Sequence, residues 1–149
     1  MSGEAARPSL DGFPAFPDHT WQALAAYLQP VSCQAGVLLF AEGDATDGLY
    51  FLVGGKFAVQ KKGELPGRMQ TVALLSGGSV AGEGALAGIA TRRASLLCLE
   101  AGVVLRLSLA DHAHLRDENP RLCLTLLHFL LRISSLRLGC CSDRLAVLL

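Results

Sequence analysis

The most informative stretch of this chain runs from Gly82 to Ser95 and reads GEGALAGIATRRAS. Its alanines and glycines stand where a further strand would need β-branched residues. Gly82 lets the backbone turn out of a strand, and residues 83–87 can form a short helical turn whose unpaired amides point at an anion. Arg92 and Arg93 then supply positive charge, because a guanidinium makes two charge-assisted bonds to phosphate oxygens.

Glu83 needs a task of its own in such a site, because a phosphate repels a neighbouring carboxylate. Accepting a hydrogen bond from a sugar hydroxyl is the obvious task, and a phosphate together with a sugar indicates a nucleotide. Arg92 alone would more often be a solvated surface charge. Its spacing from Gly82 and Glu83 is what favours a ligand site.

Around this stretch, residues 31–108 alternate short β-rich runs with turn signals. Each turn carries glycine, in one case with proline, and so can supply the backbone angles that a chain reversal needs. Many short strands at this spacing predict an antiparallel barrel or sandwich. The predicted strands are 37–41, 49–53, 57–61, 71–75, 94–99 and 103–107.

Helical signals lie on both sides of the β-rich region. Asp18 is predicted to cap a short helix that ends before Pro30. Ser108 is predicted to cap a second helix that extends through Arg116. Asn119-Pro120 then places proline in the first turn of a long helix toward Leu149.

The predicted last helix carries two apolar stripes and therefore needs two partners. We expect one face to pack on the barrel and the other to meet a second copy of the chain or a neighbouring domain. The alternatives are a helix buried within its own domain and a helix that Gly139 kinks or ends early. The stripe expected to form a dimer is Leu126, Phe129, Ile133, Leu136 and Cys140, and the other is Leu127, Leu131, Leu138, Cys141 and Leu145.

Length and composition narrow the classes of protein. The chain has 149 residues, 51% hydrophobic and 17% charged, which fits one folded domain, expected at 18–149 behind a flexible arm at 1–17. Thirteen basic and thirteen acidic residues give no net charge, so we expect no direct binding to nucleic acid or an anionic membrane.

Two further features bear on the compartment. Five cysteines, an odd number with Cys140 and Cys141 adjacent, do not form an evident disulfide framework and favour a reducing cytoplasm. We expect no secretory or membrane segment, because the longest apolar stretch, 122–133, is short and is interrupted by His128 and Arg132.

The segment from Gly82 to Ser95 resembles the phosphate-binding cassette of the cyclic nucleotide-binding domain family. That cassette reads Phe-Gly-Glu-Leu/Ile-Ala-Leu, a short spacer, then Arg-Ala/Ser-Ala. The resemblance covers about 24–138 and implies a mainly β fold with flanking helices: an antiparallel jelly-roll barrel, a short N-terminal helix and a long C-terminal lid helix. The other matching segments are Gly36, 40–44, 47–51, 54–56, 75–78 and Asn119-Pro120.

The resemblance also implies roles for individual residues. Glu83 corresponds to the carboxylate that accepts the ribose 2'-hydroxyl, Arg92 to the arginine that pairs with the cyclic phosphate, and Ser95 to a hydroxyl that touches a syn purine in some members. The amides of residues 84–86 correspond to the phosphate cradle. The candidate ligand-binding residues are Gly82, Glu83, Gly84, Ala85, Leu86, Arg92, Arg93, Ala94 and Ser95.

The chain departs from the family pattern at several positions. Ala81 replaces the usual Phe and Gly84 a branched apolar residue, which could leave the cassette looser. Arg93 falls where the family has a small residue, and it could add charge to the site or occlude it. On the lid helix, the nearest polar candidates for contact with the base are Ser135 and Arg137.

We therefore expect a non-enzymatic regulatory domain that binds cAMP or cGMP and relays this through its last helix to a second copy or an attached effector domain. The alternative is an interaction module of the same fold that has lost nucleotide binding. The histidines are scattered, and no Ser, His and Asp or Cys and His arrangement suggests catalysis. We expect no metal and no cofactor besides the nucleotide ligand.

Overall fold

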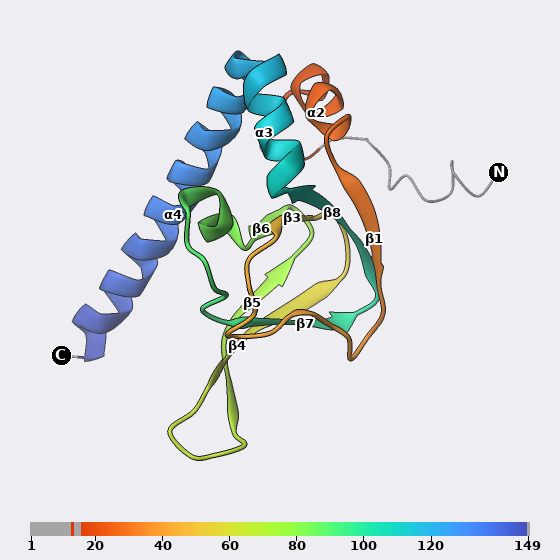
Figure 1. Cartoon of the computed structure of the whole chain (residues 1–149). Helices are drawn as coiled ribbons and strands as arrows, with labels where there is room; N and C mark the ends of the chain where they lie inside the picture. The colour runs from red at the N-terminus through yellow and green to blue at the C-terminus, as the bar shows by residue number, and fades with distance from the viewer. Residues whose placement is uncertain (1–12, 14–15, 149) are drawn as a thin grey trace.

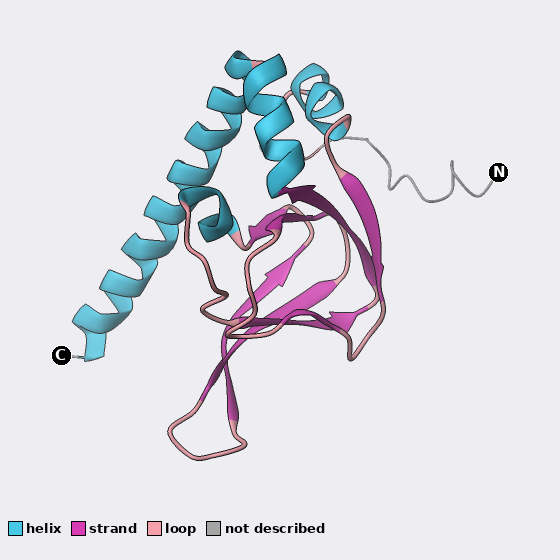
Figure 2. Cartoon of the chain, viewed as in Figure 1, coloured by secondary structure: helices cyan, strands magenta, loops and turns pink. Residues whose placement is uncertain are grey.

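Two four-stranded antiparallel sheets face each other, and the helices gather at one end and along one side of them (Figures 1 and 2). The computed structural model describes Phe13 and residues 16–148 of the chain. One sheet has the order β1-β8-β3-β6 and the other β2-β7-β4-β5, so most neighbours are distant in sequence. This is the predicted jelly-roll topology. The strands are β1 (Gln29–Cys33), β2 (Leu38–Phe40), β3 (Gly48–Leu52), β4 (Lys56–Lys62), β5 (Met69–Ser76), β6 (Ser79–Ala81), β7 (Ser95–Glu100) and β8 (Gly102–Ser108).

Strand β3 shows how the sequence builds the core. All five of its residues are buried, because side chains alternate between two apolar clusters. Leu49 and Phe51 join the cluster under the helices, while Tyr50 and Leu52 point the other way into the space between the sheets. A strand covered on both faces reads as a continuous apolar run, as β3 does.

The six strands expected from the sequence all exist, with boundaries within two residues of those predicted. Two strands escaped prediction. β6 is only three residues long, and β1 contains Pro30. Because β1 is an edge strand, paired with β8 alone, it tolerates a residue that lacks an N–H.

The helices are α2 (Asp18–Ala25), the 3-10 turn η1 (Glu83–Ala87), α3 (Leu109–Glu118) and α4 (Pro120–Leu148). The Ser108 hydroxyl accepts a hydrogen bond from the Asp111 N–H at 3.0 Å, which confirms the predicted cap of α3. The Asn119 side chain caps α4 in the same way at Leu122.

The prediction for α2 was wrong in detail. Pro17 occupies the cap position and Asp18 is the first helical residue, without a side-chain capping bond. Its negative charge still lies in the first turn, where it interacts favourably with the helix dipole. The helix ends at Ala25, four residues before β1 begins, rather than at Pro30.

The packed domain begins before Asp18, contrary to the expected boundary. Phe13 and Phe16 are buried in the main core, and the Phe13 ring lies 5.1 Å from the ring of Trp21 in a stacked arrangement. Two large aromatic side chains bury enough apolar surface to hold this segment in place. The rest of the predicted arm, 1–12 and 14–15, lies outside the described residues.

Helix α4 continues past Gly139 and carries its apolar residues into different environments. Leu126 and Phe129 are buried in the core, and Ile133 packs against it, so most of the stripe expected to form a dimer is core. Leu131, Leu136 and Leu138 are exposed instead. Cys141 and Leu145 lie outside the part of the chain whose side chains are described.

The apolar part of α4 is longer than the sequence suggested. Residues 120–140 have a mean hydropathy of 1.4 and are long and apolar enough, by length and composition, to cross a membrane. Leu122, Leu126 and Leu130 are buried in the core, which indicates the alternative reading of this segment, a helix partly buried in its own domain.

Candidate functional site

A pocket of about 670 Å³ lies between η1, the sheet that contains β4, β5 and β7, and one side of α4. All nine residues proposed from the sequence line it, from Gly82 to Leu86 on one wall and from Arg92 to Ser95 on another. The fold thus brings the two ends of the cassette to one cavity. Helix α4 adds Leu127, Leu130, Leu131, Ser134 and Arg137 to the lining.

The wall at η1 depends on Gly82. This residue has φ +78°, and a Cβ placed there would overlap the Nη1 of Arg92. A side chain at this position would therefore strain the backbone and displace the arginine. The glycine lets β6 turn directly into η1 beside the guanidinium.

The remainder of the cassette is tighter than its sequence suggests. The side chain of Ile89 lies against Gly84, where an added Cβ would be 3.1 Å from its Cδ1. Ile89 thus occupies the space left by the missing branched residue at 84. The Ala85 N–H donates to Gly82 O at 3.2 Å, so of the three amides that the resemblance assigns to the phosphate cradle this one already has an acceptor within the turn.

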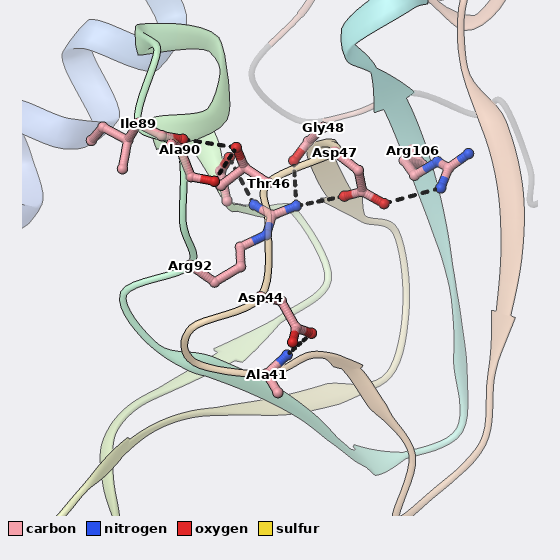
Figure 3. A network of polar contacts seen from close by, with 10 residues as sticks. Ala41, Asp44, Thr46, Asp47, Gly48, Ile89, Ala90, Arg92 and Arg106 are labelled. Atoms are coloured by element: carbon pink, nitrogen blue, oxygen red, sulfur yellow. Dashed lines mark hydrogen bonds and ion pairs between the residues drawn. The ribbon is translucent and has the colours of Figure 1, made fainter.

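Arg92 is buried at the pocket with 3% of its side chain exposed. Its Nη2 donates to Asp47 Oδ1 at 2.8 Å and to Gly48 O at 2.7 Å, and its Nη1 donates to Gly82 O at 3.3 Å (Figure 3). The guanidinium carbon also lies 4.2 Å from the centre of the Phe40 ring, a cation–π geometry. These contacts fix the direction in which the guanidinium faces.

One donor of Arg92 is left over. Its Nε–H is buried and has no hydrogen-bond partner among the described residues. Buried donors are nearly always satisfied, because an unsatisfied one costs about 1–3 kcal/mol. Arg106 Nε, on the other side of Asp47, shares this state, but Arg106 does not line the pocket. The Arg92 Nε is itself enclosed by protein atoms, so the guanidinium must shift before a ligand in the pocket can meet this donor.

The loop between β2 and β3 holds the backbone of Arg92. The Arg92 N–H donates to Asp44 O at 2.7 Å, and Gly43 N–H donates to Arg92 O at 2.8 Å. Thr46 Oγ1 donates to Ile89 O at 2.7 Å (Figure 3). This loop thus positions the end of the cassette through both backbone and side chains.

Asp47 joins two arginines. Its Oδ2 accepts from Arg106 Nη1 at 3.3 Å while its Oδ1 holds Arg92. Nearby, burial raises the pKa of the Tyr50 phenol, and the charge of Asp47 raises it further, so this hydroxyl stays neutral. Sequence reasoning did not single out Asp47, although it lies in the matching segment 47–51, because a carboxylate at a turn gives no sign of its distant partners.

Glu83 is paired with the last helix. Its Oε1 accepts from Arg137 Nη1 at 2.9 Å, and Arg137 Nη2 donates to Val80 O at 2.6 Å. Of the two polar candidates on the lid helix, Arg137 therefore reaches the site. Ser134 lines the pocket in place of Ser135, which is exposed.

Arg93 and Ser95 have different environments. Arg93 is exposed at the pocket edge, and no carboxylate pairs with it in the described part of the chain. Ser95 is buried, and its hydroxyl accepts from Glu42 N–H at 2.9 Å. A hydroxyl that accepts one bond still has a proton to donate toward the pocket. Among the side chains that the structure describes, those of residues 13 and 16–140, no group of three or more His, Cys, Asp or Glu could hold a metal ion.

Comparison with known proteins gives consistent results. The structure matches a cyclic nucleotide-binding domain from Methylobacillus flagellatus KT with TM-score 0.78 and 26% identity, covering 87% of this chain and 72% of that one. It matches the N-terminal domain of a transcriptional regulator from Streptomyces coelicolor A3(2) with TM-score 0.70 and 28% identity, covering 93% and 94%. For the catabolite activator protein of Thermus thermophilus the values are 0.67 and 28%, covering 87% and 62%.

No curated protein matches the sequence significantly. The family model for the cyclic nucleotide-binding domain matches residues 30–119, which include every strand from β2 to β8, the cassette and α3. The chain belongs to the cyclic nucleotide-binding domain family.

Proposed function

We propose that this domain binds cAMP or cGMP in the pocket and acts as a regulatory domain without catalytic activity. The observation that carries the proposal is that both ends of the cassette, residues 82–86 and 92–95, line one pocket whose lining also includes Arg137. A phosphate suits this lining, because charge-assisted bonds to guanidinium are among the strongest hydrogen bonds in proteins.

The charge of the site favours an anionic ligand. Three arginines line the pocket, at 92, 93 and 137. Glu83 compensates Arg137, but Arg92 shares the single charge of Asp47 with Arg106, and no carboxylate pairs with Arg93 among the described residues, so the site is net positive. A cyclic phosphodiester supplies one negative charge to such a site.

The apolar part of the lining suits a purine base. Side chains from the barrel and from α4 supply flat apolar surface, and only a few hydroxyls interrupt it. The hydroxyls that line the pocket, and that are candidates to distinguish adenine from guanine, belong to Thr46, Thr91, Ser95 and Ser134. The apolar lining residues include Phe40, Val59, Ala73, Leu75, Leu127 and Leu131.

We propose that α4 relays the occupancy of this pocket. It contacts the ligand site through residues 127–137 and extends beyond the barrel (Figure 1). Its start at Asn119-Pro120 is a natural hinge between α3 and α4. Exposed Leu131, Leu136 and Leu138 would meet the partner, either a second copy of the chain or an attached effector domain.

We propose a cytoplasmic location, because a reducing compartment suits the free thiols of this domain. Cys33, Cys98 and Cys123 are buried and free. Burial raises the pKa of Cys33 to about 12, so its reactive thiolate form is scarce.

Titration of the purified domain with cAMP and with cGMP tests the proposal. Saturable binding should raise the melting temperature, with a stabilisation of about 2.7 kcal/mol at a ligand concentration one hundred times the Kd. AMP, which has the same base and a more highly charged phosphate, serves as the control ligand and should bind much more weakly. No shift at millimolar concentration of either cyclic nucleotide would contradict the proposal.

Two arginine variants test the phosphate contact. Arg92→Ala should cost about 2–5 kcal/mol of binding, because it removes a buried charge-assisted partner. Arg68→Ala, at an exposed position in the β4–β5 hairpin, is the matched control and should leave binding unchanged. If Arg93→Ala abolished binding and Arg92→Ala did not, Arg93 and not Arg92 would be the residue that binds the phosphate, which would contradict the assignment.

The second candidate function is an interaction module of the same fold without a ligand. The exposed leucines of α4 favour it, because soluble domains seldom leave such side chains uncovered along one helix. Under this alternative, cyclic nucleotides would have no effect on melting, while substitution of Leu136 and Leu138 by glutamate would abolish partner binding.

A further inference from the structure

Arg137 is the side chain through which α4 reaches the cassette. Helix α4 passes beside η1 (Figure 1), and Arg137 contacts Glu83 of η1. Both terminal nitrogens of its guanidinium are used, one by the Glu83 carboxylate at 2.9 Å and one by the backbone oxygen of Val80 at 2.6 Å. A single fork thus joins three elements: α4, η1 and the edge strand β6.

This contact differs from those of the other arginine on the middle of α4. Arg132 is exposed and forms no ion pair or side-chain hydrogen bond in the described part of the chain. Arg137 is 38% exposed and its partner Glu83 is 24% exposed, so solvent screens their attraction only in part. The fork is therefore strong enough to affect where the helix lies.

Arg137 lies near the point where α4 leaves the domain surface. The residues that follow, Leu138 to Cys140, are exposed. Among the described side chains, Arg137 is the last on α4 with a polar contact to the rest of the domain. The fork is thus the final polar tie between α4 and the rest of the domain among these side chains.

We infer that Arg137 is a positioning residue of the ligand site, which orients Glu83 and ties the end of α4 to it. Arg137 occupies Oε1 of Glu83, and Oε2 has no polar partner among the described residues, so one carboxylate can serve the helix and a ribose hydroxyl together. Orientation of Glu83 and docking of α4 are then linked and must change together. The part that concerns the ribose rests on the proposed function.

The docking part is tested without any nucleotide, by amide hydrogen exchange of the full chain over residues 131–140. Arg137→Met keeps an unbranched, flexible stem but removes the fork, and exchange should become roughly threefold to tenfold faster, as expected for one partly exposed charge-assisted contact. Arg132→Met is the matched control and should leave exchange unchanged. Glu83→Gln should give a smaller acceleration than Arg137→Met. Unchanged exchange in Arg137→Met would overturn the docking role.

The positioning part is tested by comparing the affinity for cAMP with that for 2'-deoxy-cAMP. Arg137→Met should reduce the ribose preference by roughly threefold to tenfold, because a freely rotating Glu83 no longer meets the 2'-hydroxyl. Arg137→Lys, which keeps the charge but not the fork, should restore part of it. Equal losses for both ligands would make Arg137 a structural residue and refute the positioning role.

The two tests fail separately. If the unaltered chain binds neither nucleotide, the proposed function fails, and the exchange experiment still decides whether Arg137 docks α4. If Arg137→Met proves poorly folded by circular dichroism, Arg137→Lys and Glu83→Gln carry both comparisons. Normal exchange and ribose preference in those two variants would then refute the inference.

Discussion

Replacement of Asp47 by asparagine tests the arrangement that holds Arg92 at the pocket. Asn has nearly the shape of Asp, so the change removes charge with little loss of packing. Arg92 would keep its bonds to two backbone oxygens and its contact with Phe40, but would lose its only anionic partner among the described residues. The predicted effect is a loss of stability without loss of the fold.

The exposure of the two side chains sets the magnitude. Removing one partner from a fully buried ion pair costs about 3–5 kcal/mol. Here the Arg92 side chain is 3% exposed but that of Asp47 is 54% exposed, so solvent screens the interaction. We therefore expect a loss of about 2 kcal/mol, the range of a charge-assisted hydrogen bond, and a fall in Tm of about 4–8 °C for a domain of this size.

Urea unfolding followed by Trp21 fluorescence measures this change well. Trp21 is the single tryptophan of the chain and is 1% exposed, so its emission reports loss of the core. The slope of the free energy of unfolding against urea concentration should not change, since the variant exposes the same surface on unfolding. Asp117→Asn is the matched control, because the pair of Asp117 with Arg116 is exposed on both sides, and it should change stability by less than about 0.5 kcal/mol. A loss as small for Asp47→Asn would refute the reasoning.

Three further changes have defined outcomes. Gly82→Ala and Gly88→Ala both place a side chain at positive φ, but only the Cβ at position 82 meets Arg92. In urea unfolding, Gly88→Ala should therefore lower the free energy of unfolding by about 1 kcal/mol, and Gly82→Ala should lower it further and abolish nucleotide binding. Equal losses of stability in the two variants would contradict this prediction. Burial, and to a smaller extent the charge of Arg116, lowers the pKa of His112 below 6.5. Protons therefore bind the unfolded chain more tightly, and the free energy of unfolding should fall as the pH drops below about 6.5. His112→Gln should weaken this pH dependence, and an unchanged slope in that variant would exclude His112 as its cause. Ile133→Glu should destabilise the core, whereas Leu136→Glu with Leu138→Glu should leave the melting temperature unchanged and, in sedimentation, give a monomer if α4 forms a dimer.

The local features of this protein could be predicted from the sequence. Caps such as Ser108, turns with glycine and alternating apolar residues act within a few residues of chain, so their signals are contiguous. The cassette is local in the same sense: Gly82 to Ser95 is one segment, and the fold closes its two ends around one pocket. This is why the family, and nine of the residues that line the pocket, could be predicted from the sequence.

The tertiary structure alone decided which distant groups meet. Arg92 pairs with Asp47, 45 residues earlier, and Glu83 pairs with Arg137, 54 residues later. Nothing at either end of these pairs indicates its partner, because a charged side chain is compatible with solvent at any turn or helix surface. In the same way, α4 carries two apolar stripes of similar composition, and only the shape of the barrel and the rings of Phe13 and Phe16 select the one with Leu126 and Phe129 for the core. Propensity acts along the chain, whereas burial and pairing depend on the elements that the complete fold places side by side.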